Sequence, residues 1–241
     1  MAQETSKSHI DRLGKRLKLG KVEDDLHLLE QYRHSFRAAH EFVYRELREK
    51  LLLEPTKRRT KTTQSIVDKL LRGSIKLTQI QDIAGCRIVV KDIADQNKIV
   101  DQLRILFDNH KIKDRRENPS HGYRAVHVIV FVNGKAVEIQ VRTELQHLWA
   151  EKSEKLADSF GQEVKYGGGE ELVRKDLKVS SDNVKILEEV EVGLEVYRSK
   201  NPKANITQVI NLEKLLLRVK KGQQDAMDNM VKEFEKLMGL S

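Results

Sequence analysis

Two carboxylates stand where they could hold a divalent cation. Asp82 directly precedes the apolar run IAGCRIVV at residues 83–90, and Glu138 lies in KAVEIQVRT at residues 135–143. Both runs have the length and the β-branched content of strands. If the two strands are neighbours, Asp82 and Glu138 can converge on one hard cation, since Mg²⁺ takes one or two carboxylates together with substrate phosphates. The simpler interpretations are a turn or cap residue for Asp82 and a solvated sheet face for Glu138.

A second group of chemically useful residues is basic. Residues 57–76 contain seven lysines and arginines against one aspartate, which is a net +6 out of the +8 of the whole chain. Ser65, Lys69 and Arg72 lie at helical spacing on adjoining positions. Such a surface suits contact with phosphates, and its arginines can also stack on a base; a solvated charged face is the alternative. The sequence has no GxxxxGK(S/T) motif, which excludes a P-loop.

A third group lies at the strand starts and inside the strands. In PSHGYRAVH, Tyr123 can present a flat stacking surface beside the cation of Arg124, although a tyrosine at the start of a strand is usually ordinary packing. Arg87 lies inside the first apolar strand, where a charged side chain must be paired or face a cleft. His127 lies on the face of its strand opposite to Val126 and Val128. A structural histidine is a simpler interpretation than a binding residue.

The elements that must position these groups follow from periodicity. Apolar residues recur every three or four positions from Val22 to Leu53, which predicts one long amphipathic helix that Pro55 stops. Asn133-Gly134 between the runs at 126–132 and 135–143 is a strong hairpin signal, because both residues tolerate positive φ. Strands are predicted at 83–90, 111–114, 126–132 and 135–143, and further helices at 62–73, 92–110, 144–158, 170–199 and 206–238.

This order of elements predicts an α/β (α+β) fold, in which helices flank a mixed sheet and a helical C-terminal extension follows. Residues 1–20 are expected to be a basic, loosely ordered N-terminal arm. The main domain would span residues 21–165, and a break at Gly167-Gly168-Gly169 would mark the boundary with the extension at 166–241.

Composition narrows the class of protein. The 241 residues carry 45 lysines and arginines against 37 aspartates and glutamates, and this formal charge of +8 favours a polyanionic partner. Cys86 is the single cysteine, which excludes a disulfide framework and cysteine-based zinc sites. No apolar run approaches the roughly 20 residues of a membrane span, and the N-terminus lacks the apolar core of a signal peptide. We therefore expect a cytoplasmic protein with no membrane partner.

Four motifs, in this order, resemble the synthetase domain of the RelA/SpoT family of alarmone synthetases, in a match over roughly residues 40–165: RRTKTTQSIVDKL, QDIAGCRIVV, HGYRAVH and VEIQVRTELQHLWA. The resemblance implies a nucleotidyltransferase-like mixed sheet flanked by helices. It also implies an ATP-dependent pyrophosphokinase that transfers the β,γ-pyrophosphate of ATP to the 3′-hydroxyl of GDP or GTP, makes (p)ppGpp and releases AMP. Because the sequence lacks the His-Asp pair of the family's hydrolase domain, it resembles the short, synthetase-only members.

The resemblance also implies roles for individual residues. Asp82 would be a ligand of the cofactor Mg²⁺, and Glu138 would be a second ligand or the base that draws the proton from the 3′-hydroxyl. Arg59 and Arg87 match the two arginines that clamp the adenine ring. The remaining ATP-binding set is Lys61, Ser65, Lys69 and Arg72, and the acceptor-binding set is Tyr123, which would stack on the base, with Arg124, His127, Gln140 and Arg142.

The acceptor side departs from the family pattern. His121 replaces the Lys or Ser that many members carry before Gly-Tyr, and WAEKSEKLAD replaces a Glu-His pair followed by Tyr-Lys. The alternative is a toxin-type member that pyrophosphorylates the 3′-CCA end of tRNA, a polyanion that a basic chain would suit. The basic residues to examine for this alternative are Lys15, Arg16, Lys18 and Lys21.

A third hypothesis is a catalytically inactive module that binds a nucleotide or RNA. The intact Asp82 and Glu138 argue against it. The partners under these hypotheses are ATP with GDP or GTP, or tRNA. Further partners would be a second copy of this chain, in a homo-oligomer, or an antitoxin protein, and the sequence does not decide between these possibilities.

Overall fold

The computed structural model describes residues 6–20, 22–55 and 57–200 and scattered positions between 214 and 225, and for the strand at 57–60 it describes the backbone. The chain forms two compact units. The first unit consists of Met1–Ile88, Val100–Lys113 and His127–Val141, and the second consists of Val89–Ile99, Asp114–Val126 and Arg142–Ser241.

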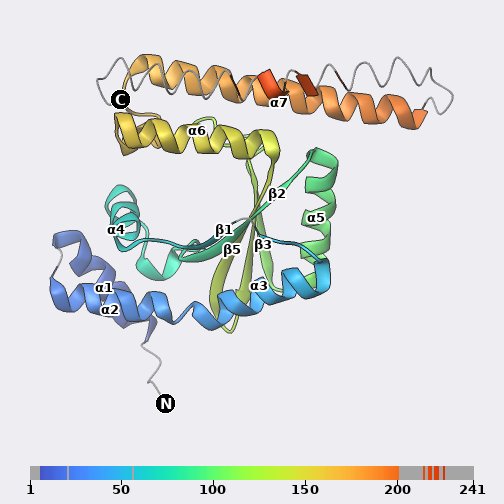
Figure 1. Ribbon diagram of the computed structural model, residues 1–241. Coiled ribbons are helices and arrows are strands. Elements are labelled where there is room, and N and C mark those ends of the chain that lie inside the picture. Colours follow the sequence, from blue (N-terminus) through green and yellow to red (C-terminus); the bar gives the residue numbers. More distant parts are fainter. Residues whose placement is uncertain are drawn as a thin grey trace. The chain divides into compact units, whose positions relative to one another are not determined.

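A five-stranded mixed sheet lies mainly in the first unit, with the strand order β1-β2-β5-β4-β3 (Figure 1). The predicted strands are confirmed, β2 and β5 are neighbours, and Asn133-Gly134 turns the hairpin with positive φ at both residues. The additional strand, β1, is antiparallel to β2. The strands are β1 (Lys57–Thr60), β2 (Ala84–Val90), β3 (His110–Asp114), β4 (Val126–Val132) and β5 (Lys135–Thr143).

The first unit contains the helices α1 (Lys7–Leu19), α2 (Glu23–His34), α3 (Arg37–Leu51), α4 (Thr63–Arg72) and the 3₁₀ helix η1 (Leu77–Gln79). All of these except α3 share an apolar core with Ala84 at the start of β2. The core beneath α1, α2, α4 and η1 includes the buried side chains of Leu13, Leu29, Ile66, Leu70, Leu77 and Ile83.

The N-terminal residues differ from the prediction. Residues 7–19 form α1 and not a loosely ordered arm. Ile10, Leu13 and Leu17 are spaced by three and four positions and are buried, so they form one apolar face of the helix. The hydroxyl of Ser6 accepts a hydrogen bond from the backbone N–H of His9 at the start of the helix. The many charged residues around this short stripe obscured its periodicity.

The single helix predicted from Val22 to Leu53 is two helices, separated by Ser35 and Phe36. The Ser35 hydroxyl donates to the Tyr32 carbonyl at 2.6 Å, so a side chain competes with the backbone for this acceptor. Phe36 is buried and meets the Tyr32 ring edge-on, with 5.2 Å between the ring centroids. Both helices keep the same apolar spacing, and periodicity alone therefore does not reveal the break.

The second unit is built on α6 (Glu144–Phe160), the 3₁₀ helix η2 (Gln162–Tyr166) and α7 (Glu171–Lys200), with α6 and α7 side by side (Figure 1). α5 (Ile93–Leu106) begins in this unit and ends in the first. Thr143 and Gln146 form a capping box at the start of α6, each side chain accepting a hydrogen bond from the other's backbone N–H. The shared apolar core includes Trp149, Leu156, Val164, Leu177 and Val184.

Because α7 shares this core with α6, the division predicted at residue 166 does not coincide with a break in packing. The helix predicted at 170–199 is confirmed as α7, whereas the helix predicted at 206–238 lies largely outside the described residues. Over the described part of the chain, no helix combines the length and the apolar character that crossing a membrane requires.

Candidate functional site

A small cavity of about 30 Å³ in the first unit is lined by both predicted carboxylates, Asp82 and Glu138. A space of this size holds one water molecule or one small ion. The strand that Asp82 precedes and the strand that carries Glu138 are neighbours, which is the arrangement that the sequence pattern requires. The other residues that line the cavity are Lys61, Gly85, Cys86 and Gln140.

Asp82 is held by two lysines. Lys61 Nζ donates to Oδ2 at 2.8 Å, and Lys69 Nζ donates to Oδ1 at 2.9 Å. Burial pushes the pKa of Asp82 upward, but the charges of Lys61 and Lys69 outweigh it and leave the pKa below its ordinary value. Asp82 is therefore ionised at neutral pH, and both of its oxygens are already charge-paired.

Glu138 is also ionised. His127 Nδ1 lies 2.9 Å from Oε1, and Gln140 Nε2 donates to Oε2 at 2.7 Å. Burial raises the pKa of Glu138, but the hydrogen bond and charge of His127, the Gln140 hydrogen bond and the Lys69 charge together lower it to about 2. His127 and Gln140, predicted to bind the acceptor, thus contact the carboxylate of Glu138 in this structure, and their acceptor role stays a prediction.

Gly85 is a site residue that the sequence reasoning missed. A Cβ at this position would lie 2.4 Å from the carbonyl oxygen of Glu138, so β2 and β5 approach each other here too closely for a side chain. A glycine inside a strand often marks a place where another backbone approaches closely, and this pattern in the sequence could have identified Gly85. The neighbouring Cys86 is buried, and burial raises the pKa of its thiol to about 12, which leaves it without the reactive thiolate form.

The predicted phosphate-binding residues of α4 do not all gather at the carboxylates. Lys69 contacts Asp82, as described. Ser65 lies in the first turn of α4, where its hydroxyl accepts from Thr62 Oγ1 at 2.8 Å. Arg72, at the other end of the helix, is exposed.

The two arginines expected to clamp adenine lie on adjacent strands. Arg87 is buried in β2, with 7% of its surface exposed. Arg59 lies opposite Gly85 in the β1–β2 register. The side chain of Arg59 is outside the described parts of the chain, and the clamp therefore stays a prediction.

Tyr123 and Arg142 form a pair in the second unit. Arg142 Nη2 donates to the Tyr123 hydroxyl at 2.9 Å, and Arg142 Cζ lies 4.9 Å from the centroid of the ring. The hydrogen bond and the cation–π contact together fix the orientation of the ring. An aromatic ring and a cation in contact are suited to a ligand that has both a base and phosphates.

Arg124 contacts protein groups in this structure, and its acceptor-binding role stays a prediction. Its side chain is buried, its Nε donates to Ser181 Oγ at 3.2 Å, and its Nη1 donates to the carbonyl of Arg116. These contacts are all internal to the second unit. Arg124 therefore holds the loop that carries Tyr123, and the cation beside the Tyr123 ring is that of Arg142.

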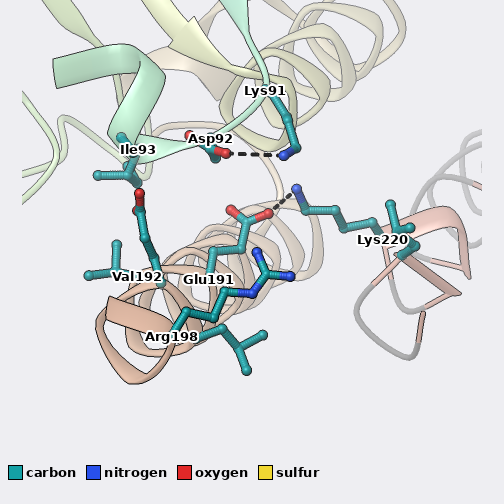
Figure 2. A pocket seen from close by; sticks show the side chains of 11 residues that line it. Lys91, Asp92, Ile93, Glu191, Val192, Arg198 and Lys220 are labelled. Carbon is teal, nitrogen blue, oxygen red and sulfur yellow. Dashed lines mark ion pairs between the residues drawn. The ribbon is translucent and has the colours of Figure 1, made fainter. Parts of the chain in front are cut away.

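A larger cavity, of about 360 Å³, lies in the second unit (Figure 2). Four of its charged side chains form ion pairs, Lys91 with Asp92 at 3.6 Å and Lys220 with Glu191. None of the predicted site residues lines this cavity, and we assign no function to it.

Known proteins share the central part of this chain. Residues 58–157 match the family described as the region found in RelA / SpoT proteins. An uncharacterised protein of Mycobacterium tuberculosis (strain ATCC 25618 / H37Rv) is 40% identical over 112 residues, which cover 45% of this chain and 41% of that protein. The GTP pyrophosphokinase YwaC of Bacillus subtilis (strain 168) is 33% identical over 129 residues, which cover 46% of this chain and 61% of YwaC. The chain thus spans less than two thirds of the length of either relative.

Among solved structures, the small alarmone synthetase 2 from Bacillus subtilis resembles this chain with a TM-score of 0.51. It is 26% identical, and the similarity covers 73% of this chain and 98% of the synthetase. The matched residues 58–157 contain Asp82, Glu138, Tyr123 and Arg142. Residues 58–157 are thus similar to the region found in RelA / SpoT proteins.

Proposed function

We propose that this chain is an ATP-dependent pyrophosphokinase that transfers the β,γ-pyrophosphate of ATP to the 3′-hydroxyl of GDP or GTP and releases AMP. The observation that carries the proposal is the pair of ionised carboxylates, Asp82 and Glu138, on one small cavity with Lys61 and Lys69 beside Asp82. The match of residues 58–157 to the region found in RelA / SpoT proteins and the similarity to a GTP pyrophosphokinase, YwaC, support it.

The donor set fits Mg²⁺, the cofactor that the family implies. Asp82 and Glu138 both have pKa values below the ordinary range, so two charged oxygen donors face one ion-sized space. Mg²⁺ needs no more than one or two carboxylates when phosphates and water complete its shell. The described residues contain no group of three or more His, Cys, Asp or Glu that could hold a metal ion, so phosphates would supply the missing ligands. Asp82 and Glu138 would hold the cation, which would neutralise charge on the phosphates.

In the transfer, the 3′-oxygen of the acceptor bonds to the β-phosphorus of ATP while the bond from that phosphorus to the α-phosphate oxygen breaks. AMP leaves with that oxygen, and the hydroxyl proton passes to a base. Glu138 is a buried, ionised acceptor for the hydroxyl, but its pKa of about 2 makes it a weak base. Its main contribution is therefore to orient the hydroxyl, because phosphoryl-type transfer depends on positioning and charge neutralisation more than on base strength.

Lys61 and Lys69 supply the positive charge for the polyphosphate. Each donates to one oxygen of Asp82 in this structure. An ammonium group on a flexible stem can exchange one oxygen acceptor for another. When ATP binds, the two lysines would move from the carboxylate to phosphate oxygens and leave Asp82 available to the cation.

The basic N-terminal residues give little support to tRNA as the acceptor. Arg16 forms an ion pair with Asp25 at 2.7 Å, and Lys18 Nζ donates to the carbonyl of Gly73 at 3.1 Å. Two of the four cations to examine for contact with tRNA are thus engaged within the first unit. GDP or GTP stays the proposed acceptor, and tRNA is an outcome that the assay distinguishes.

The proposal is tested by incubating the protein with ATP labelled at the γ-phosphate and Mg²⁺, with GDP, GTP or deacylated tRNA offered separately. Label is expected in GDP or GTP. Label found in tRNA alone would overturn the proposed acceptor, and no transfer to any acceptor would support an inactive binding module.

Glu138→Gln tests the role of the carboxylate. It should lower the rate of transfer about 10²–10⁴-fold, the usual range for a positioned catalytic group, while ATP affinity stays within about twofold, since Gln keeps the shape of the side chain. Glu49→Gln is the matched control, because Glu49 is exposed on α3 of the same unit. Wild-type turnover by the Glu138→Gln protein would refute the assignment.

A further inference from the structure

One face of α7 is buried but is not wholly apolar. Leu177, Ser181, Val184 and Glu188 are spaced by four, three and four positions, so they lie on one side of the helix, and all four are buried. Burying a hydroxyl or a carboxyl costs free energy unless it is hydrogen-bonded. The two polar residues of this face therefore require partners, and both have them.

Ser181 contacts the loop that carries Tyr123 at two points. Its hydroxyl donates to the carbonyl of Gly122 at 2.7 Å and accepts from Arg124 Nε at 3.2 Å. These two partners are the residues immediately before and after Tyr123. The Ser181 hydroxyl thus holds the backbone of Gly122, before the tyrosine, and the side chain of Arg124, after it.

The loop has little freedom apart from these bonds. Gly122 has φ of +87°, and a Cβ there would lie 2.7 Å from the Trp149 ring and 3.3 Å from Ser181 Cβ. Trp149 is itself bonded to α7, through Nε1–H donated to the Leu177 carbonyl at 2.9 Å. The loop therefore passes between the indole ring of α6 and the buried face of α7.

Glu188 holds the end of β5 to the same face of α7. Its Oε1 accepts from Thr143 Oγ1 at 2.6 Å and from Gln146 Nε2 at 2.9 Å. Thr143 directly follows Arg142, which contacts the Tyr123 ring. The two residues that form the aromatic–cation pair are thus each next to a residue that α7 binds.

We propose that Ser181 is a positioning residue, which holds the Gly122–Arg124 loop so that the Tyr123 ring is set for stacking on the acceptor base. This inference rests on the proposed function, because it assigns the second unit's Tyr123 to the acceptor nucleotide. It gives α7 a part in acceptor binding, although no residue of α7 itself contacts the acceptor in this scheme.

Ser181→Ala and Ser180→Ala make a matched pair for the test. Ser180 is adjacent on α7, and its hydroxyl donates to the Asp176 carbonyl within the helix at 2.9 Å. Both variants lose one hydroxyl, but Ser181→Ala alone loses the bonds to the loop. We expect Ser181→Ala to raise the KM for GDP about tenfold, as the loss of one or two hydrogen bonds predicts, and to leave the KM for ATP unchanged.

Two further measurements separate positioning from a general loss of stability. Hydrogen exchange of the backbone amides of residues 120–126 should speed up in Ser181→Ala and stay at the wild-type rate in Ser180→Ala. Ser181→Thr, which keeps the hydroxyl, should restore both the GDP KM and slow exchange. Ser181→Thr behaving like Ser181→Ala would overturn the role of the hydroxyl. Equal effects of the two alanine variants, or an unchanged GDP KM and exchange rate in Ser181→Ala, would overturn the inference.

The exchange measurement also keeps this inference distinct from the proposed function. If the wild-type protein transfers label to no acceptor, the proposed function fails. In that case the exchange rates of residues 120–126 still decide whether Ser181 holds the loop. If the wild-type protein transfers label to GDP but Ser181→Ala is indistinguishable from it, the proposed function stands and the inference fails.

Discussion

Gly85→Ala tests whether the carboxylate site depends on the close approach of β2 and β5. A Cβ at residue 85 would lie 2.4 Å from the Glu138 carbonyl oxygen, whereas ordinary contact begins at 3.4 Å. The two strands must therefore separate locally by about 1.0 Å, the difference between these distances. The contact is with a backbone atom, so a change of rotamer cannot relieve it.

The displacement falls on Glu138, the residue whose carboxylate we propose to be catalytic. Forcing an extra methyl group into a closely packed place costs about 1–3 kcal/mol of folding free energy. A misplacement of about 1 Å at a reacting group costs on the order of 10²-fold in rate. We expect the Gly85→Ala protein to stay folded, to lose stability within that range and to transfer pyrophosphate about 100-fold more slowly.

The assay combines turnover with labelled ATP and GDP with unfolding in urea. Gly193→Ala is the matched control, because Gly193 lies within α7 and an added Cβ there would meet nothing within 4 Å. Alanine in the interior of a helix should add about 0.5–1 kcal/mol of stability and leave turnover unchanged. A Gly85→Ala protein that folds and turns over at the wild-type rate would refute the reasoning from strand contact.

The other predictions concern two glutamates whose pKa values shift in opposite directions. Burial raises the pKa of Glu188 from 4.5 to about 6, so its charge costs stability above pH 6, and this cost disappears as pH falls to 4.5. Glu188→Gln should therefore add about 2 kcal/mol to the free energy of unfolding at pH 7.5 and little at pH 4.5; an equal gain at both pH values would contradict this. Glu138, whose pKa is lowered to about 2 from 4.5, contributes stability that is present above pH 4.5 and is lost toward pH 2. Between pH 7 and pH 3, the free energy of unfolding measured in urea should fall less in Glu138→Gln than in wild type. The ionised Glu138 contributes about 3 kcal/mol in full, of which part is lost by pH 3. Parallel pH profiles for the two proteins would argue against a charged Glu138.

Local signals predicted the elements around the site well. The hairpin at 126–143 appears as expected, because Asn133-Gly134 fixes the turn. In β5 the alternation of apolar and polar residues indicates which of them share a face. The break at Ser35-Phe36 was not predicted, because two helices in the same register show the same periodicity as one. Helix α1 was missed because its three buried residues are few among many charges.

The sequence predicted the two carboxylates of the candidate site, but not the residues that position the site's elements. Asp82 and Glu138 could be paired from sequence because polar residues beside apolar strands are conspicuous. Gly85 was not singled out, since its role depends on the distance to a neighbouring strand. Arg124 contacts Ser181 on a distant helix, which a sequence does not show, and its acceptor-binding role stays a prediction. Ser181 is 57 residues from Arg124 in the chain, which places that contact beyond any local pattern.

The single cysteine has a consequence for measurement. Cys86 lies in β2, the strand between β1 and β5, and it also lines the carboxylate cavity. A buried thiol with a pKa of about 12 reacts negligibly with thiol reagents until its strand is exposed to solvent. The rate at which such a reagent labels the native protein therefore follows the opening of β2 itself. Labelling of Cys86 therefore measures how often the sheet opens beside Asp82 and Glu138, without an engineered label.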